Sequence, residues 1–228
     1  MEKCVKRYSL RWLAVMTCFV VATTAMAQDF LSTRTVSLNK TVKGGSFKAT
    51  VEFPVEGGSQ VMESVMKWIG FILDTDTDFG RDYQRMLQAS CDTFVISGQG
   101  GDRSIVIERS FEDGDCVTYE SMVTDKGSET WRWADCASFS KRDGHRIRLD
   151  EIFNCGLTDI QQLMWEYRGD LPMSVDSPEE LVPVNAGFID GWVIVIGQAR
   201  HYTGATYRLR YDEIVSFLHT GEGGYFSR

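Results

Sequence analysis

The sequence predicts an α+β fold in which a mostly antiparallel sheet has helices packed on one side, built as two closely packed subdomains. Three observations carry this prediction. Many segments alternate apolar and polar residues between Asp-Gly or Gly-Gly turns, as β-hairpins do. Other segments repeat apolar residues at steps of three and four, as amphipathic helices do. No repeat, low-complexity tract or proline-rich linker interrupts the chain.

The first elements expected after the N-terminal segment are a hairpin and a helix. Two alternating runs, 35–42 and 47–55, flank the turn residues 43–46. A helix is then expected to begin at Ser59, because apolar residues recur at helical steps. Its buried face would consist of Val61, Val65, Trp68 and Ile72. A shorter helix is expected at about 82–90, followed by strands at 93–96 and 104–111.

The central region, 115–153, is typical of a hairpin meander that leads into a short helix. Its first turn lies at Asp125-Lys126-Gly127, and a second turn at 142–145 is expected to return the chain through Ile147 and Leu149. A turn centred on Lys126 would place Cys116 opposite Cys136. Directly opposed cysteines on antiparallel strands can meet disulfide geometry, so the sequence predicts a Cys116–Cys136 bridge.

The C-terminal elements follow the same two periodicities. A helix is expected at 157–167, and a proline-containing loop follows it. Strands are expected at Phe188, 192–196 and 205–209, and the run 193–196 is apolar on both faces, which favours a central strand. The apolar stripe of the terminal helix would consist of Tyr211, Ile214, Phe217 and Leu218.

The first 27 residues are typical of a cleaved signal peptide. Four basic residues precede the apolar run 12–24, which ends in Ala25-Met26-Ala27. The run is short for a membrane span, so we expect no stable membrane span after cleavage following Ala27. An uncleaved anchor is the alternative, and lipidation at Cys18 is disfavoured by the residues before it. The expected localisation is therefore periplasmic or secreted.

Charge and cysteine content narrow the class of protein. The signal carries four basic residues and one acid, net +3, so its removal changes the formal net charge from −8 to −11. An acidic chain without a basic cluster argues against nucleic acid or an anionic membrane as a partner. Four cysteines remain, an even number in an oxidising compartment. Cys91–Cys155 would follow as the second bridge by exclusion, and four free thiols are the alternative.

Several motifs of the C-terminal half carry a family resemblance. They are Phe139–Phe153 (FSKRDGHRIRLDEIF), Phe188–Ile196, Tyr202-Thr203-Gly204 and Arg210–Leu218. Together they resemble the RsiV-like domain, a family of uncharacterised function found in the lysozyme-sensing anti-sigma factor RsiV and in some peptidoglycan deacetylases. The resemblance covers roughly Arg103–Leu218, and the preceding hairpin and helix resemble the small domain that commonly precedes it. It implies a domain division into 28–102 and 103–228.

The sequence also departs from the family pattern. Many members carry a histidine-containing loop between the long strands, where this chain has Gly127–Trp131. A proline-containing segment of the relatives corresponds here to Ala199–Gly204, which has no proline. The short segment before the apolar run leads us to expect no sigma-binding region, and no deacetylase domain accompanies the RsiV-like one.

The sequence contains no recognisable catalytic, metal or cofactor motif. Asp74–Gly80 alternates carboxylates, but its glycine and the residue at the twelfth position do not fit a calcium loop. Two Ser-x-x-Lys matches lack the companion motifs of penicillin-recognising enzymes. We therefore expect no catalytic residue, no metal and no cofactor. The candidate ligand-binding residues are Trp131, Trp133, Arg200, His201 and Tyr202, because aromatic and arginine side chains dominate binding hot spots.

These observations predict an exported, non-catalytic protein that binds a macromolecule of the bacterial cell envelope. The resemblance implies a lysozyme-like protein or a cell-wall component as the ligand. One alternative is an envelope hydrolase in which Glu108 and Glu120 converge in a cleft and act as acid and base. Another is a structural assembly factor of the envelope. The two tryptophans would serve packing instead of binding if both pointed into the core.

Overall fold

The computed structural model describes residues 30–75, 78–98, 100–169, 175–199, 202–220 and Tyr225, with the backbone alone for 199, 202 and 203. The chain from Leu31 onward is one compact unit. The predicted signal peptide thus lies outside the described residues. Among those that are described, no helix combines the length and the apolar character needed to cross a membrane.

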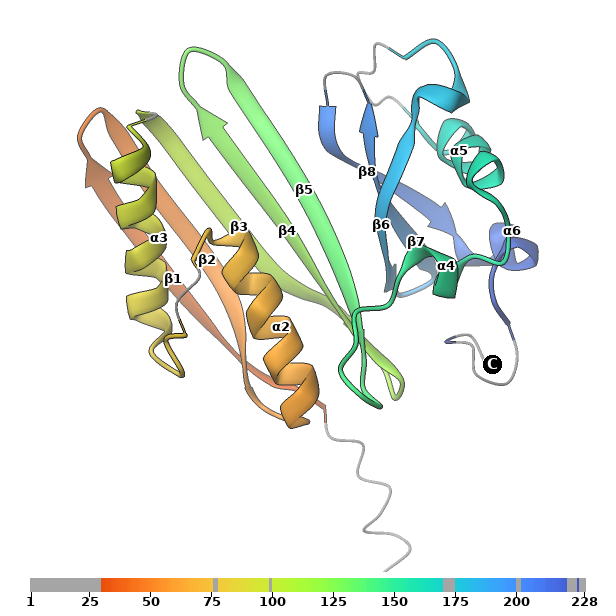
Figure 1. Ribbon diagram of the computed structural model, residues 1–228, viewed down its shortest axis with the longest axis horizontal. Helices are drawn as coiled ribbons and strands as arrows, with labels where there is room; N and C mark the ends of the chain where they lie inside the picture. The colour runs from red at the N-terminus through yellow and green to blue at the C-terminus, as the bar shows by residue number, and fades with distance from the viewer. Residues whose placement is uncertain are drawn as a thin grey trace, which may run out of the picture. The chain divides into compact units, whose positions relative to one another are not determined.

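The first sheet has five strands in the order β1-β2-β3-β4-β5 (Figure 1). They are β1 (Ser32–Val42), β2 (Gly45–Glu56), β3 (Gly101–Glu112), β4 (Cys116–Lys126) and β5 (Thr130–Ser140). All neighbouring pairs are antiparallel except β2 and β3, which are parallel. Two helices, α2 (Ser59–Ile72) and α3 (Tyr83–Ser97), connect this parallel pair. A parallel pair requires such a long crossover, whereas a tight turn joins antiparallel strands.

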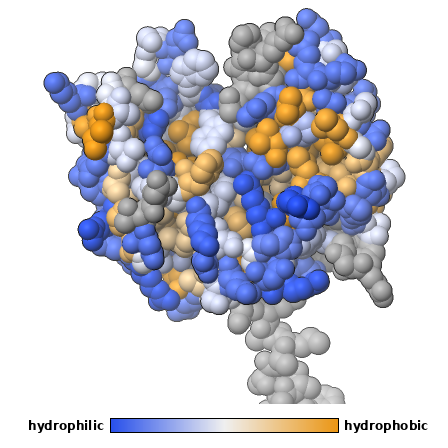
Figure 2. Space-filling model, in the orientation of Figure 1, coloured by the Kyte–Doolittle hydropathy of each residue, from blue (hydrophilic) through white to orange (hydrophobic). Residues whose placement is uncertain are grey.

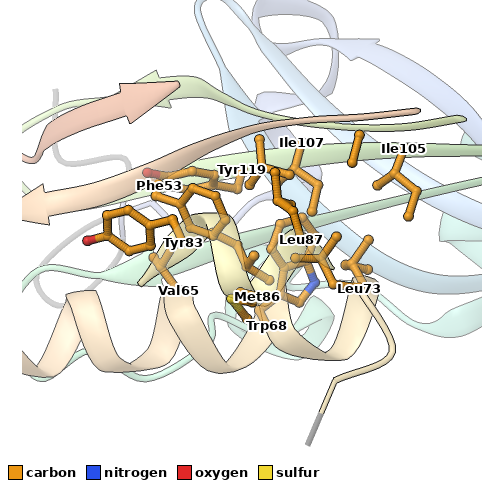
Figure 3. Close-up of a cluster of buried hydrophobic side chains, with 14 of the residues drawn as sticks. Phe53, Val65, Trp68, Leu73, Tyr83, Met86, Leu87, Ile105, Ile107 and Tyr119 are labelled. Carbon is orange, nitrogen blue, oxygen red and sulfur yellow. The ribbon is translucent and has the colours of Figure 1, made fainter. Parts of the chain in front are cut away.

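The helices α2 and α3 cover one face of the five-stranded sheet (Figure 1). Their apolar faces meet the alternate residues of the strands in one large cluster (Figure 3). Its fully buried members include Phe53, Leu87, Ile107 and Tyr119. Each such apolar side chain contributes about 1.5–3 kcal/mol when it is fully removed from water. Seen from this side, the surface is mostly hydrophilic with scattered apolar groups (Figure 2).

The second sheet has three antiparallel strands in the order β6-β7-β8. They are β6 (Val182–Ile189), β7 (Trp192–Ala199) and β8 (Tyr202–Arg210). The short helix α4 (Leu149–Ile152) and the longer α5 (Leu157–Glu166) contact this sheet, and α6 (Tyr211–Ile214) follows β8. The turn η1 (Pro178–Glu180) precedes β6, and η2 (Val215–Phe217) follows α6.

The two sheets meet at β5, which contacts β6, β7 and β8. Ile194 and Ile196 of β7 pack against Ala134 and Cys136 of β5 in a small cluster of their own. The alternate residues of β7, among them Val193, pack on the opposite side with residues of α5. The prediction that 193–196 is a central strand buried on both faces is therefore confirmed, as is the α+β class. The boundary proposed at residue 103 stays a prediction; β3 crosses that position without a break.

Two details of the expected elements are wrong. The strand expected at 93–96 belongs to α3, which runs to Ser97 and ends at Gly98 in the left-handed conformation. Aromatic and β-branched residues favour strands, but here Phe94 packs into the core on a helix face. The return strand expected through Ile147 and Leu149 is reduced to an isolated bridge between Phe139 and Arg146.

The disulfide predictions rest on a register that the structure does not have. Cys116 lies opposite Ser140 and Cys136 opposite Glu120, because the hairpin is centred two residues later than expected. The two cysteines are thus offset by four strand residues, about 13 Å at the strand rise, beyond the reach of a disulfide. Cys91 and Cys155 pack with different clusters. All four cysteines are free in the structure.

Candidate functional site

An aromatic cluster formed by Phe71, Trp131 and Trp133 lies where α2 ends beside β5. The side chain of Trp131 is 62% exposed and that of Phe71 is 68% exposed. Trp133 is half-buried against the helix-side core, and its ring meets that of Phe71 edge-to-face with centroids 6.3 Å apart. Three neighbouring aromatic side chains, two of them mostly in solvent, form a surface suited to binding an apolar or sugar face.

The local sequence explains why this cluster is exposed. Trp131 and Trp133 are two residues apart on a strand and so share the face that further along carries Ala137 and Phe139. Those later residues are buried beneath α2, and Trp68 contacts Phe139 edge-on. The helix ends at Ile72, so it covers the second half of β5 and leaves the first half open. The alternative in which both tryptophans point into the core is therefore wrong for Trp131.

The other predicted ligand-binding residues lie at the hairpin between β7 and β8. Arg200 and His201 lie outside the described residues, and for Tyr202 only the backbone, at the start of β8, is described. This strand nevertheless reaches the predicted tryptophans, because Gly204 packs directly on the backbone of Ala134 beside Trp133. A Cβ at Gly204 would stand 2.3 Å from the carbonyl oxygen of Ala134, so only glycine allows this approach. A single site for all five residues stays a prediction.

A second feature, the sheet groove, lies where β8 crosses the helix-free side of β3 and β4. Its volume is about 350 Å³. The residues that line it are Val106, Glu108, Glu120, Ser121, Met122, Ala134, Asp135, Ile196, Thr206 and Arg208. Glu108 and Glu120 occupy directly opposed positions on β3 and β4. The convergence on which the hydrolase alternative depends is therefore present.

The two carboxyl groups of the sheet groove differ in environment. Glu108 is exposed, and Glu120 is half-buried. Burial raises the pKa of Glu120, the charge of Glu108 acts in the same direction, and the guanidinium of Arg208 opposes them. Two neighbouring carboxyl groups in different environments are an arrangement that general acid and base catalysis can use.

Asp135 also borders the groove, but its carboxylate is already engaged. It accepts hydrogen bonds from the indole of Trp68 at 3.1 Å and from the amide of Asn185 at 2.6 Å, and Arg146 lies 3.5 Å away. With 4% exposure it is a buried, fully paired charge. It therefore holds α2, β5 and β6 together and is not free to act on a ligand.

Sequence reasoning missed Phe71 and Arg208. Phe71 lies on the polar side of α2, in line with Ser64 and Lys67, so helical spacing predicts its exposure but not its contact with Trp133. Arg208 alternates with buried residues of β8, a pattern that predicts exposure but not proximity to Glu120. No group of three or more His, Cys, Asp or Glu in the described part of the chain is arranged to hold a metal ion.

Comparison with known proteins shows the class to which this fold corresponds. The chain matches no family model and no curated protein by sequence. Its fold is that of solved structures from the DUF3298 family, a domain of unknown function.

One of these structures is a DUF3298 family member from Bacteroides fragilis, with a TM-score of 0.65 and 10% sequence identity over 84% of this chain and 95% of that one. Another is a DUF3298 family protein from Pseudomonas aeruginosa, with a TM-score of 0.56 and 11% sequence identity over 84% of this chain and 96% of that one. At such identities the likeness concerns the fold. The narrower resemblance to RsiV-like domains stays an expectation.

Proposed function

We propose that the protein is an exported binding protein that recognises a macromolecule of the cell envelope through the aromatic cluster. The observation that supports this proposal is the exposure of Phe71 and Trp131 beside Trp133. Exposed aromatic side chains add to the free energy of binding when a partner covers them, and tryptophan is the residue most enriched at binding hot spots. Export rests on the signal-like segment 1–27.

The chemistry of the partner follows from charge and from the sequence resemblance. Without the signal-like segment the chain carries a formal net charge of −11, which favours the approach of a basic macromolecule. The RsiV-like motifs support a lysozyme-like protein, and the aromatic rings would also stack on the sugar faces of a cell-wall component. Of these two, the charge favours the basic protein.

The test is calorimetric titration of the purified protein with lysozyme, in parallel with Trp131→Ala. We expect micromolar or tighter binding that is weakened about tenfold or more by the substitution, which corresponds to about 1.4 kcal/mol. Leu157→Ala is the matched control, because Leu157 is 58% exposed but lies on α5, away from the cluster. No heat at high concentration, or equal affinity of both variants and the wild type, would contradict the proposal.

A second candidate function is acid and base hydrolysis in the sheet groove. The observation that favours it is the opposed pair Glu108 and Glu120 together with the raised pKa of Glu120. Dye-labelled peptidoglycan would be incubated with the protein and with Glu120→Gln across a pH series. Hydrolysis would release dye and fall as pH rises through the raised pKa, and Glu120→Gln would abolish it. Glu129→Gln, in the exposed β4–β5 turn, is the control and should release dye as the wild type does. If the wild type releases no dye, the hydrolase function is excluded.

A further inference from the structure

A second cavity, the acidic aromatic pocket, shares no described lining residue with the sheet groove and includes none of the predicted ligand-binding residues that the structure describes. Its volume is about 230 Å³. It is bordered by the β3–β4 turn, by the β6–β7 turn and by the start of α6. The side chains that carry the argument are Phe111, Asp113, Asp115, Asp190, Trp192 and Tyr211.

Hydrogen bonds hold the polar parts of the acidic aromatic pocket in place. One carboxylate oxygen of Asp113 accepts from the backbone N–H groups of Asp115 and Cys116, at 2.8 and 2.9 Å. On the other side, the backbone N–H of Tyr211 donates to the carbonyl of Gly191 at 3.0 Å, which ties α6 to the β6–β7 turn. The three carboxylates are therefore carried by short, well-defined turns.

The described residues that line the pocket carry negative charge and no positive charge. None of its described lining residues is Lys, Arg or His, and none of the three aspartates forms an ion pair with a residue that the structure describes. Nearby carboxylates differ: Glu112 is paired with Arg109 and Lys141. Burial raises the pKa of the Cys116 thiol at the pocket wall, and Asp113 and Asp115 raise it further; Lys141, which is paired with Glu112, opposes them. A cation is therefore the ligand charge that this cavity favours.

The walls indicate which kind of cation fits. The three aspartates do not form a metal-ligand set, because no three acidic, His or Cys groups among the described residues are close enough to share one ion. Phe111, Trp192 and Tyr211 instead present aromatic rings beside the carboxylates, and Trp192 is 37% exposed. Aromatic faces attract ammonium groups through the ring quadrupole and also accommodate an apolar chain.

We propose that the acidic aromatic pocket binds an organic ammonium ion, with the charged nitrogen on the side of the pocket that carries the aspartates and its apolar body against Phe111, Trp192 and Tyr211. This site is separate from the aromatic cluster and requires no catalytic step.

The test uses the ¹⁵N-labelled protein and n-butylammonium chloride as the probe. The indole N–H signal of Trp192, assigned with Trp192→Phe, should shift in a saturable way. The double variant Asp115→Asn/Asp190→Asn should weaken binding tenfold or more. It should fold normally, because Asp190→Asn gives Asn-Gly, which forms the same tight turn as Asp-Gly, and because Asp115 is exposed. Asp150→Asn is the control, since Asp150 is an exposed acid on α4 and should bind the probe as the wild type does.

Three results would overturn the proposal. Neutral 1-butanol could saturate the same signal with equal affinity, which would make the site merely apolar. The double variant could bind butylammonium as tightly as the wild type, which would remove the carboxylates from recognition. Calcium chloride could displace the probe at lower concentration than butylammonium itself requires, which would make the site a metal site. Loss of lysozyme binding in Trp131→Ala would leave the expected result here unchanged.

Discussion

The turn after β5 is held by a hydrogen-bonded chain of three side chains, Asp143, His145 and Glu151. Nδ1 of His145 lies 2.6 Å from Asp143 and Nε2 lies 2.9 Å from Glu151. Partial burial lowers the pKa of His145, but the hydrogen bonds and charges of Asp143 and Glu151 outweigh it, and the net shift is upward. The hydrogen bond from His145 lowers the pKa of Asp143 to about 2. Both hydrogen bonds therefore stabilise the doubly protonated imidazolium, which donates from both nitrogens, relative to the neutral ring.

The hydrogen bonds of His145 to Asp143 and Glu151 predict that the stability of the protein depends on pH through this one residue. Because the pKa of His145 is higher in the folded state, its contribution to stability is fully present below the unfolded value, about 6.5, and is lost as pH rises through the folded value. The size is expected to stay within about 1 kcal/mol, since exposed pairs are screened by water. NMR titration should give a His145 pKa above its ordinary value that falls in Asp143→Asn. His219→Gln, the control, should leave the pKa of His145 unchanged. A His145 pKa at or below its ordinary value would contradict the role of the two hydrogen bonds.

A second residue-scale prediction concerns Gly144 in the same turn. Gly144 has φ +75°, and a Cβ there would stand 2.5 Å from the backbone carbon of Gln60 at the start of α2. Gly191 has nearly the same φ, +73°, but open space around it. Gly191→Ala should therefore cost only the left-handed strain, about 1–2 kcal/mol. Gly144→Ala should lower the free energy of unfolding by about 1 kcal/mol more than Gly191→Ala does, as measured by urea denaturation. Equal losses would show that the backbone contact is unimportant.

At the scale of elements, the buried carboxylate of Asp135 connects a helix and two strands. Its partners come from α2, β6 and the segment after the 142–145 turn. Asp135→Ala should lower the free energy of unfolding by about 3–5 kcal/mol, because it removes the acceptor of the buried Trp68 indole and of the Asn185 amide and leaves the charge of Arg146 without its carboxylate. Asp125→Ala is the control: its close ion pair with Arg103 at 2.7 Å is nearer the surface and should be worth about 1 kcal/mol. Similar losses in both variants, measured by chemical denaturation, would refute the role of Asp135.

Elements defined by local patterns could be predicted from the sequence, and their pairing could not. The helix α2 follows from the spacing of Val61, Val65 and Trp68, all of which are buried. The end of α3 was missed because Phe94 favours strands by intrinsic preference, and contacts with Phe47 across the core override that preference. The register of β4 and β5 depends on loop length, and the loop here spans 127–129.

The same division applies to the candidate sites. Residue type pointed to Trp131 and Trp133, and strand alternation placed them on one face. Whether that face was covered depended on where α2 ends, which is a contact between distant parts of the sequence. The opposed position of Glu108 and Glu120 was likewise a hypothesis until the pairing of β3 and β4 was known. The acidic aromatic pocket joins three separate turns and has no signature in any one segment.

At the scale of the whole molecule, three buried thiols lie in three different packing clusters, so labelling each thiol can follow the unfolding of its cluster. Cys91 belongs to the helix-side core, Cys116 to the core beneath α5, and Cys136 to the junction of the two sheets. Because Leu31–Arg228 is one compact unit, the clusters should open together. Pulsed maleimide labelling across a urea series should give one midpoint for these three cysteines, with the half-buried Cys155 labelled earlier. Separate midpoints would show independently unfolding parts.

The parallel pairing of β2 with β3 has a consequence for the order of folding. Gly45 pairs with Gly101 across the whole length of α2 and α3, whereas β4 pairs with β5, and β7 with β8, across turns of a few residues. Chain entropy opposes contacts between distant residues, so the local hairpins form quickly and the closure of β2 onto β3 comes late. Until then, the edge of β3 that β2 later covers is open to another chain. During this interval newly made chains are most exposed to misassociation through that edge. The length of the crossover between β2 and β3 therefore affects how long the folding chain is open to aggregation.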